Sequence, residues 1–179
     1  MRDRRLTLLL HGANLWYLGE GMLGPLFAVF AQKVGGSVLD ISWAWATYLI
    51  IAGLLHVVVG RLADTPIGKE RLMVAGYAMN ALFTFGYLLV DAPWKLFAVQ
   101  AGLGIGSALA TSTWYALYSE RADGSTEWGL TVGYREIILG GALITGGFIV
   151  SAFSFATLFV VMGSIQLIAT AYQARILWD

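Results

Sequence analysis

Six long apolar stretches, separated by short charged or turn-forming segments, constrain this chain more than any other feature of its sequence. A helix of roughly 20 apolar residues crosses a bilayer, so a chain of this length holds at most about seven such spans. Hydrophobic residues make up 58% of the chain and charged residues 12%, whereas about a quarter of a soluble domain is charged. We therefore predict an all-α integral membrane protein.

We expect a single domain over residues 1–179 with six transmembrane helices, at residues 6–31, 41–62, 72–90, 94–118, 129–151 and 155–175. Gly21, Gly24 and Pro25 lie in the second half of the first span and permit a bend there. The basic N-terminus and the apolar run after it also resemble a signal peptide, but the run contains Asn14 and Glu20 and exceeds the usual length of a signal core.

The placement of lysine and arginine predicts the orientation, because basic residues favour the cytoplasmic side of short loops. With the N-terminus inside, the outer side receives Lys33 and Lys95, and Arg135 is set aside as intramembrane. The inner side then receives eight basic residues: Arg2, Arg4, Arg5, Arg61, Lys69, Arg71, Arg121 and Arg175. Both termini are therefore expected in the cytoplasm.

The charged break between the second and third expected spans carries the most informative motif. Gly60, Asp64, Gly68, Lys69 and Arg71 follow an order that resembles the cytoplasmic loop between helices two and three of major facilitator superfamily transporters. The second glycine falls four residues after the aspartate, where three is usual in that family. The resemblance implies a conformational-gating role for these residues. Taken alone, the break also matches any short charged loop between two membrane helices.

Three further segments are similar to the same family: Gly21–Phe27 to the glycine-proline pattern of its first helix, Gln100–Ala108 to the glycine motif of its fourth, and Gly140–Gly147 to the glycine pattern of exporters in its fifth. The fourth-helix motif normally includes an arginine, whose place Gln100 or Ala98 takes here, and the fifth lacks the usual proline. The resemblance implies a transporter in a prokaryotic inner membrane, with no enzymatic activity and no cofactor.

Members of this family usually contain two six-span repeats in the same orientation, and this chain corresponds to one repeat. Two copies related by a two-fold axis along the membrane normal would enclose a central cavity. We therefore expect a homodimeric secondary transporter of a small molecule that works by alternating access, with possible coupling to protons. The alternatives are a non-transporting assembly subunit, one half of a heterodimeric carrier, and a fragment of a longer carrier.

Glu20 is the sharpest candidate for the substrate and proton pathway. It lies near the middle of the first expected span, where a carboxylate costs on the order of 3 kcal/mol, which favours a functional role. Tyr17 shares a helical face with Glu20, and Asn14 flanks that face. The alternative is a protonated Glu20 that hydrogen-bonds a neighbouring helix.

Four further residues are assigned to the same pathway. Arg135 is expected to bind an anionic substrate or pair with Glu20, or else to extend toward the inner interface with Glu136 as its local partner. Trp114 and Tyr115, at the inner end of the fourth span, are candidates for shaping the substrate site, although aromatic residues near an interface are commonly anchors.

The sequence argues against other classes of function. It contains no cysteine and two histidines, which exclude a disulfide framework and a thiolate metal site and give no zinc cluster. Acidic and basic residues number eleven each, so no basic surface indicates nucleic-acid binding. A membrane hydrolase is the remaining rival, but no Gly-x-Ser-x-Gly element is present.

Overall fold

The computed structural model describes residues 4–63, 68–122 and 124–178, and within these ranges the chain is helical, with no strand. The α-helices are α1 (Arg4–Gly21), α2 (Leu26–Lys33), α3 (Val38–Ala63), α4 (Lys69–Gly86), α5 (Pro93–Ser119), α6 (Ser125–Ala152) and α7 (Phe155–Gln173). Two 3₁₀ turns, η1 (Tyr87–Leu89) and η2 (Ala174–Leu177), extend α4 and α7. The all-helical prediction is confirmed.

Five helical segments of the described chain are long and apolar enough to cross a membrane: Val38–Ala63, Lys69–Leu89, Pro93–Ser119, Ser125–Ala152 and Phe155–Leu177. Their bounds lie within a few residues of the last five expected spans. The first expected span is instead divided into two helices. Neither is long and apolar enough to cross a membrane, because α1 carries six polar or charged residues and α2 has only 8 residues. The predicted count of six spans is thus not confirmed.

The predicted bend lies between α1 and α2. Gly24 has a φ of 22°, a backbone conformation that residues with a Cβ rarely adopt, and Pro25 precedes the first residue of α2. Helix α6 packs closely on this break, because a Cβ added at Gly146 would lie 2.1 Å from the carbonyl oxygen of Met22. Glycine at position 146 therefore permits the contact between α6 and the bend.

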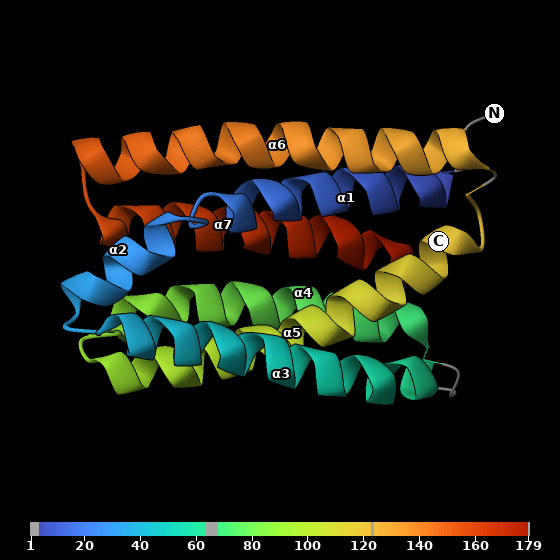
Figure 1. Ribbon diagram of the computed structural model, residues 1–179. Helices are drawn as coiled ribbons and strands as arrows, with labels where there is room; N and C mark the ends of the chain where they lie inside the picture. The colour runs from blue at the N-terminus through green and yellow to red at the C-terminus, as the bar shows by residue number, and fades with distance from the viewer. Residues whose placement is uncertain (1–3, 64–67, 123, 179) are drawn as a thin grey trace.

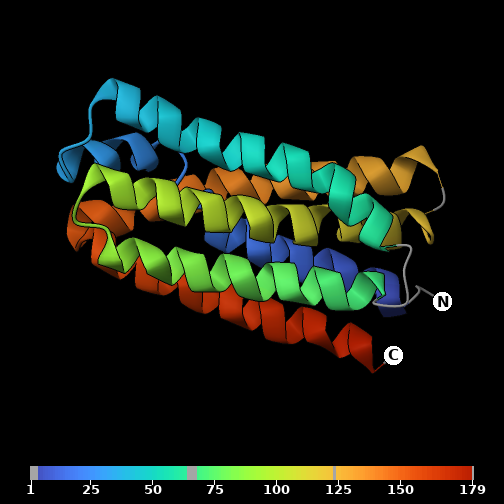
Figure 2. The same cartoon turned by 90° about the horizontal axis from the view of Figure 1, so that it is seen from below.

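The helices run side by side as one bundle (Figures 1 and 2). Helix α5 packs against α3 and α4, α7 packs against α1 and α4, and α6 packs against α1. The starts of α1, α4 and α6 and the ends of α3, α5 and α7 lie at the same end of the bundle (Figure 1). Near α2, the core contains a cluster around Phe30, Tyr87 and Phe159, and a second cluster surrounds Trp16 and Trp114.

Small residues bring α4 and α5 close together, as the glycine motif of the fourth expected span predicts. A Cβ at Gly76 would lie 2.3 Å from the backbone nitrogen of Ala110, and one at Gly106 would lie 3.0 Å from the backbone nitrogen of Asn80. The two backbones are in contact over this stretch, which fixes the position of the polar Asn80 inside the bundle.

Two helices present most of their surface to the outside. Helix α6 buries only Ala142 and Gly146, and α3 buries four of its 26 residues. The large side chains Leu54 on α3 and Ile144 on α6 are 67% and 78% exposed. These two faces are available for lipid or for another protein chain.

Candidate functional site

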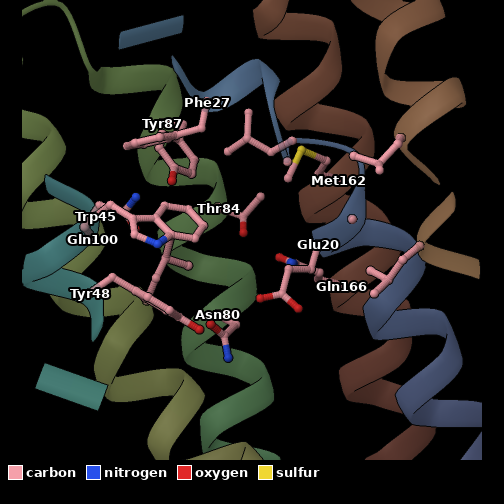
Figure 3. Close-up of a pocket in the computed structure, with 16 residues that line it drawn as sticks. Glu20, Phe27, Trp45, Tyr48, Asn80, Thr84, Tyr87, Gln100, Met162 and Gln166 are labelled. Carbon is pink, nitrogen blue, oxygen red and sulfur yellow. The ribbon is translucent and has the colours of Figure 1, made fainter. Parts of the chain in front are cut away.

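A cavity of about 330 Å³ lies inside the bundle at the level of the break between α1 and α2. Residues from all seven α-helices and from η1 line it, and Figure 3 shows the side chains that surround it. Its volume falls within the range of about 300–1,000 Å³ that is usual for small-molecule pockets. We call it the central cavity.

Glu20 is the acidic residue of the central cavity. It lies in the last turn of α1, one residue before the helix ends at Gly21, and its carboxylate points into the cavity in Figure 3. Within the described part of the chain, nothing donates a hydrogen bond to this carboxylate and nothing forms a salt bridge with it. A half-buried carboxylate without such partners is costly in a membrane protein and marks a candidate functional group.

Two buried amides accompany Glu20 in the lining. Gln100 on α5 and Gln166 on α7 are each 2% exposed, yet Nε2 of Gln100 and Oε1 of Gln166 have no hydrogen-bond partner among the described residues. Buried polar atoms are normally satisfied, and each unsatisfied one costs about 1–3 kcal/mol. A bound ligand or water would provide the missing partners.

Two other polar lining residues, Asn80 and Tyr48, have hydrogen-bond partners within the protein. Asn80 donates a hydrogen bond from Nδ2 to the carbonyl oxygen of Gly76 at 3.1 Å, and the Tyr48 hydroxyl donates to Ser107 Oγ at 3.0 Å. These bonds hold α4 and α3 side chains in place around the cavity. The fully buried lining atoms that have no partner thus belong to Gln100 and Gln166, and Glu20 adds a carboxylate without a hydrogen bond.

Aromatic and aliphatic side chains make up most of the remaining wall. Phe27, Trp45 and Tyr87 surround one side of the cavity (Figure 3), and the rings of Phe27 and Trp45 lie 5.6 Å apart. Neither lysine nor arginine is present among the lining residues that the structure describes. The cavity therefore combines one carboxylate with aromatic faces and without basic side chains.

The cavity reaches the surface on the side of α3 and α6. Trp45 on α3 and Leu143 on α6 both line it, and these two residues are 47% and 38% exposed. Most other lining residues are buried. A ligand would therefore approach between the two helices that present most of their surface to the outside.

Tyr17, predicted to share the helical face of Glu20, and Asn14, predicted to flank that face, do not line the central cavity with Glu20. Asn14 lines a different, shallow groove between α1, α6 and α7, together with His11 and Thr145. Tyr17 borders a small pocket beside Trp114. Of the seven residues predicted for the pathway, Glu20 is the one that lines the central cavity.

Arg135 pairs locally on α6. Its Nη2 and Nε atoms donate hydrogen bonds to Glu136 Oε1 at 2.7 and 3.1 Å, and its guanidinium lies 5.9 Å from the centre of the Tyr17 ring. This is the local partner that the sequence offered as an alternative to pairing with Glu20. Both residues lie outside the central cavity, and the Glu136 side chain is 60% exposed.

Trp114 and Tyr115 belong to an aromatic cluster away from the cavity. The indole Nε1 of Trp114 donates a hydrogen bond to the carbonyl oxygen of Leu9 at 3.0 Å, and its ring stacks on Tyr118 at 4.8 Å. Tyr115 stacks on Trp128 at 6.2 Å. These contacts join α5 to α1 and to the start of α6, so both residues have packing roles in this structure.

The predicted gating loop is described only in part, because Asp64 lies outside the described residues. Gly60 has no neighbour within 4 Å of an added Cβ, and Gly68 precedes α4 with a φ of 85°. Lys69 forms a salt bridge with Glu120 at 2.5 Å, while Arg71 is exposed. The loop is therefore linked to the end of α5.

Sequence reasoning missed most of the cavity lining. From the sequence, Gln100 was named only at the place of the arginine in the fourth-helix motif, and Gln166, Thr84, Trp45 and Tyr87 were not identified. One signal was available, because Thr84, Gln100 and Gln166 are uncharged polar residues within three different expected spans. Polar side chains at that depth are expected to face the interior of a bundle.

Comparison with known proteins identifies the family. The family model of the Major Facilitator Superfamily matches residues 9–179. The chain is 22% identical over 163 residues to the multidrug resistance protein MdtG of Dickeya zeae, covering 87% of this chain and 40% of that protein. It is 29% identical over 94 residues to the uncharacterized MFS-type transporter MJ1560 of Methanocaldococcus jannaschii, covering 52% of this chain and 24% of that one.

A third relative, the uncharacterized MFS-type transporter EfpA of Mycobacterium tuberculosis, is 37% identical over 79 residues, covering 42% of this chain and 14% of that protein. The chain thus spans less than half the length of each of these relatives. The helical membrane architecture, the order of the glycine motifs and the family match over nearly the whole sequence agree. The chain belongs to the Major Facilitator Superfamily.

Proposed function

We propose that this chain is one half of a secondary active transporter for a small molecule, and that two copies form the complete carrier. The observation that carries the proposal is the central cavity: a member of this superfamily holds a membrane-level pocket with an unpaired carboxylate and two unpaired amides. In this arrangement α1 and α2 together act as a sixth, broken span. Both termini are then in the cytoplasm, on the side that receives most of the basic residues.

The exposed faces of α3 and α6 support a second copy as the partner. Glu136 and Arg135 lie on α6 about 15 Å from its first residue, which places them within the membrane. Charged side chains that face acyl chains are costly, by on the order of 3 kcal/mol each. A second copy with the same orientation would cover these charges, and it would also cover the opening of the central cavity between α3 and α6.

Alternating access needs contacts at one end of the bundle that break and form again. Two ion pairs link different segments at the end of the bundle where α1 begins: Arg5 with Glu70 at 3.5 Å and Lys69 with Glu120 at 2.5 Å. They join the starts of α1 and α4 to the end of α5. In the proposed carrier, these partly exposed pairs stabilise the conformation that is closed at this end.

Proton coupling is assigned to Glu20. It is the acidic residue of the cavity lining, and the described residues give it neither a hydrogen bond nor a salt bridge that would hold it in the charged form. A carboxylate in such a place can exchange a proton when the cavity changes the side to which it opens. Coupled transport therefore requires a titratable group at position 20.

The test uses the purified chain in vesicles that contain a trapped pH-sensitive dye. A panel of small cations, anions and neutral compounds is added with and without an imposed pH gradient, and proton movement is recorded. We expect at least one compound to drive proton movement, and Glu20→Gln to abolish it. Asp91→Asn serves as the matched control, because Asp91 is an exposed carboxylate outside the cavity that pairs with Lys95.

Two results would contradict the proposal. If Glu20→Gln is folded and retains full proton-coupled movement, then Glu20 is not the coupling group. If native mass measurement in lipid finds only single copies, and no compound moves, then the chain does not form a carrier by itself. The assembly subunit or the heterodimer half would then be the better account.

A further inference from the structure

The lining of the central cavity also identifies the kind of molecule that it would hold, and this inference rests on the proposed transport function. Three properties of the lining matter: its charge, its unpaired hydrogen-bonding atoms and its aromatic wall. The residues that give these properties lie far apart in the sequence, on α1, α2, α3, η1, α5 and α7. Because these residues meet in one cavity, their combined properties determine which class of ligand the cavity can bind.

The charge of the lining favours a cation. Glu20 contributes a carboxylate, and the described lining includes no lysine, arginine or histidine to balance it. Arg135 is near enough to act electrostatically on Glu20, but its hydrogen bonds go to Glu136 and its guanidinium lies over the Tyr17 ring. A ligand with one positive charge would provide Glu20 with the counter-charge that the protein does not place in the cavity.

The aromatic wall favours a cation whose charge is spread over carbon, rather than a small hydrated metal ion. The faces of aromatic rings attract cations within about 6 Å, and they bind quaternary ammonium groups well. Trp45, Phe27 and Tyr87 form this wall. Hard metal ions would need several oxygen ligands, whereas no group of three or more acidic or histidine residues suited to a metal exists in the described part of the chain.

The unpaired amides add a polar requirement. Gln100 offers a donor at Nε2 and Gln166 an acceptor at Oε1, and both side chains are 2% exposed. A ligand with a polar group beside its apolar body, or with a water molecule carried in with it, would complete these hydrogen bonds. Filling unmet hydrogen bonds gives selectivity over molecules that lack the matching groups.

We propose that the central cavity is a binding site for a small organic monocation with an apolar, preferably aromatic, body. The positive group lies between Glu20 and the ring of Trp45, and the apolar part lies against Phe27 and Tyr87. Each copy of the chain contains all of these residues. We therefore expect one binding site in each chain.

The test measures equilibrium binding to the purified chain in detergent, without any gradient. The probe is benzyltrimethylammonium, and the control ligand is neopentylbenzene, which has the same shape but a carbon atom in place of the charged nitrogen. Protein-free micelles provide the correction for partition into detergent. We expect the cation to bind wild-type protein at least tenfold more tightly than the neutral isostere, with one site per chain.

Three variants locate the site. Glu20→Gln is expected to remove the preference for the cation, and Asp91→Asn is expected to keep it, since Asp91 lies in the exposed connection between η1 and α5. Trp45→Leu is expected to weaken cation binding by at least about threefold, because it removes one aromatic face from the positive charge. Circular dichroism and size-exclusion chromatography establish that each variant is folded.

Equal affinity for the cation and the isostere in wild-type protein would overturn the inference, whatever the variants show. A folded Glu20→Gln protein that keeps the full preference would also overturn it. The outcome is separable from that of the transport proposal. If the cation binds but no compound is transported into vesicles, the transport proposal is refuted and the cation site stands. If anions are transported but the cation does not bind, the cation site is refuted and the transport proposal stands.

Discussion

The contact between α6 and the break in the first span depends on the lack of a side chain at Gly146. An added Cβ would lie 2.1 Å from the carbonyl oxygen of Met22 and 3.0 Å from its Cα, and both are backbone atoms that no rotamer change can move. The variant Gly146→Ala therefore forces α6 away from the break. Overpacking of this kind costs about 1–3 kcal/mol, which lowers Tm by about 2–12 °C for a chain of this size.

Gly141→Ala is the matched control on the same helix, because a Cβ at Gly141 meets nothing within 4 Å. There, alanine improves helix propensity, so its stability should be unchanged or higher by up to about 1 kcal/mol. Thermal unfolding of both variants is followed by circular dichroism in the same detergent. If Gly146→Ala is as stable as Gly141→Ala, the close approach of α6 to Met22 is wrong, and with it the position of Glu20 relative to α6.

Three further predictions concern the core, the cavity and the loop. Phe159→Ala should lower stability by about 3–5 kcal/mol because Phe159 is 1% exposed among Phe30 and Tyr87, whereas Phe148→Ala, at a side chain 66% exposed, should have little effect in thermal unfolding. Gln100→Met keeps the shape but removes the unpaired amide, so it should raise stability by about 1 kcal/mol while weakening ligand binding; a loss of stability would mean that the amide is satisfied. Lys69→Glu should lower stability by less than about 1 kcal/mol and slow transport, and the double variant with Glu120→Lys should recover both; failure of the double variant to recover either would remove this pair from the gating argument.

The helical spans could be predicted from the sequence because each is a long apolar run with few charges. The ends of five of them were located within a few residues, since Pro93, Gly124 and Ser154 lie directly before or at the start of helices α5, α6 and α7. The first span was harder. Gly24 and Pro25 predicted a bend, but its completeness depends on the packing of Gly146 against Met22, a contact between residues more than a hundred positions apart.

The residues that line the central cavity were less predictable from the sequence, because packing between helices that are distant in the sequence brings them together. Tyr17 and Glu20 do lie three residues apart in one helix, α1, but this spacing says nothing about which neighbour each residue meets. In the structure, Tyr17 lies beside Trp114, while Glu20 lies where α1 ends and the chain turns away. The amides that complete the cavity come from α5 and α7, and only the packing of these helices brings Gln100 and Gln166 to the level of Glu20.

The charged pair on α6 favours a protein partner more than the exposed apolar surface of the bundle does. The apolar face of α3, where Leu54 is 67% exposed, is as stable against lipid as against another protein chain, because acyl chains are as apolar as leucine. The Arg135–Glu136 pair on α6 is different, since its carboxylate is 60% exposed on a helix that is long and apolar enough to cross a membrane, and a charge that faces acyl chains is costly. In the proposed two-fold dimer with α6 at the interface, the Arg135–Glu136 pairs of the two copies would lie at the same depth, within protein instead of lipid. The surface that lipid would solvate least well is thus the one that a second copy would complement best.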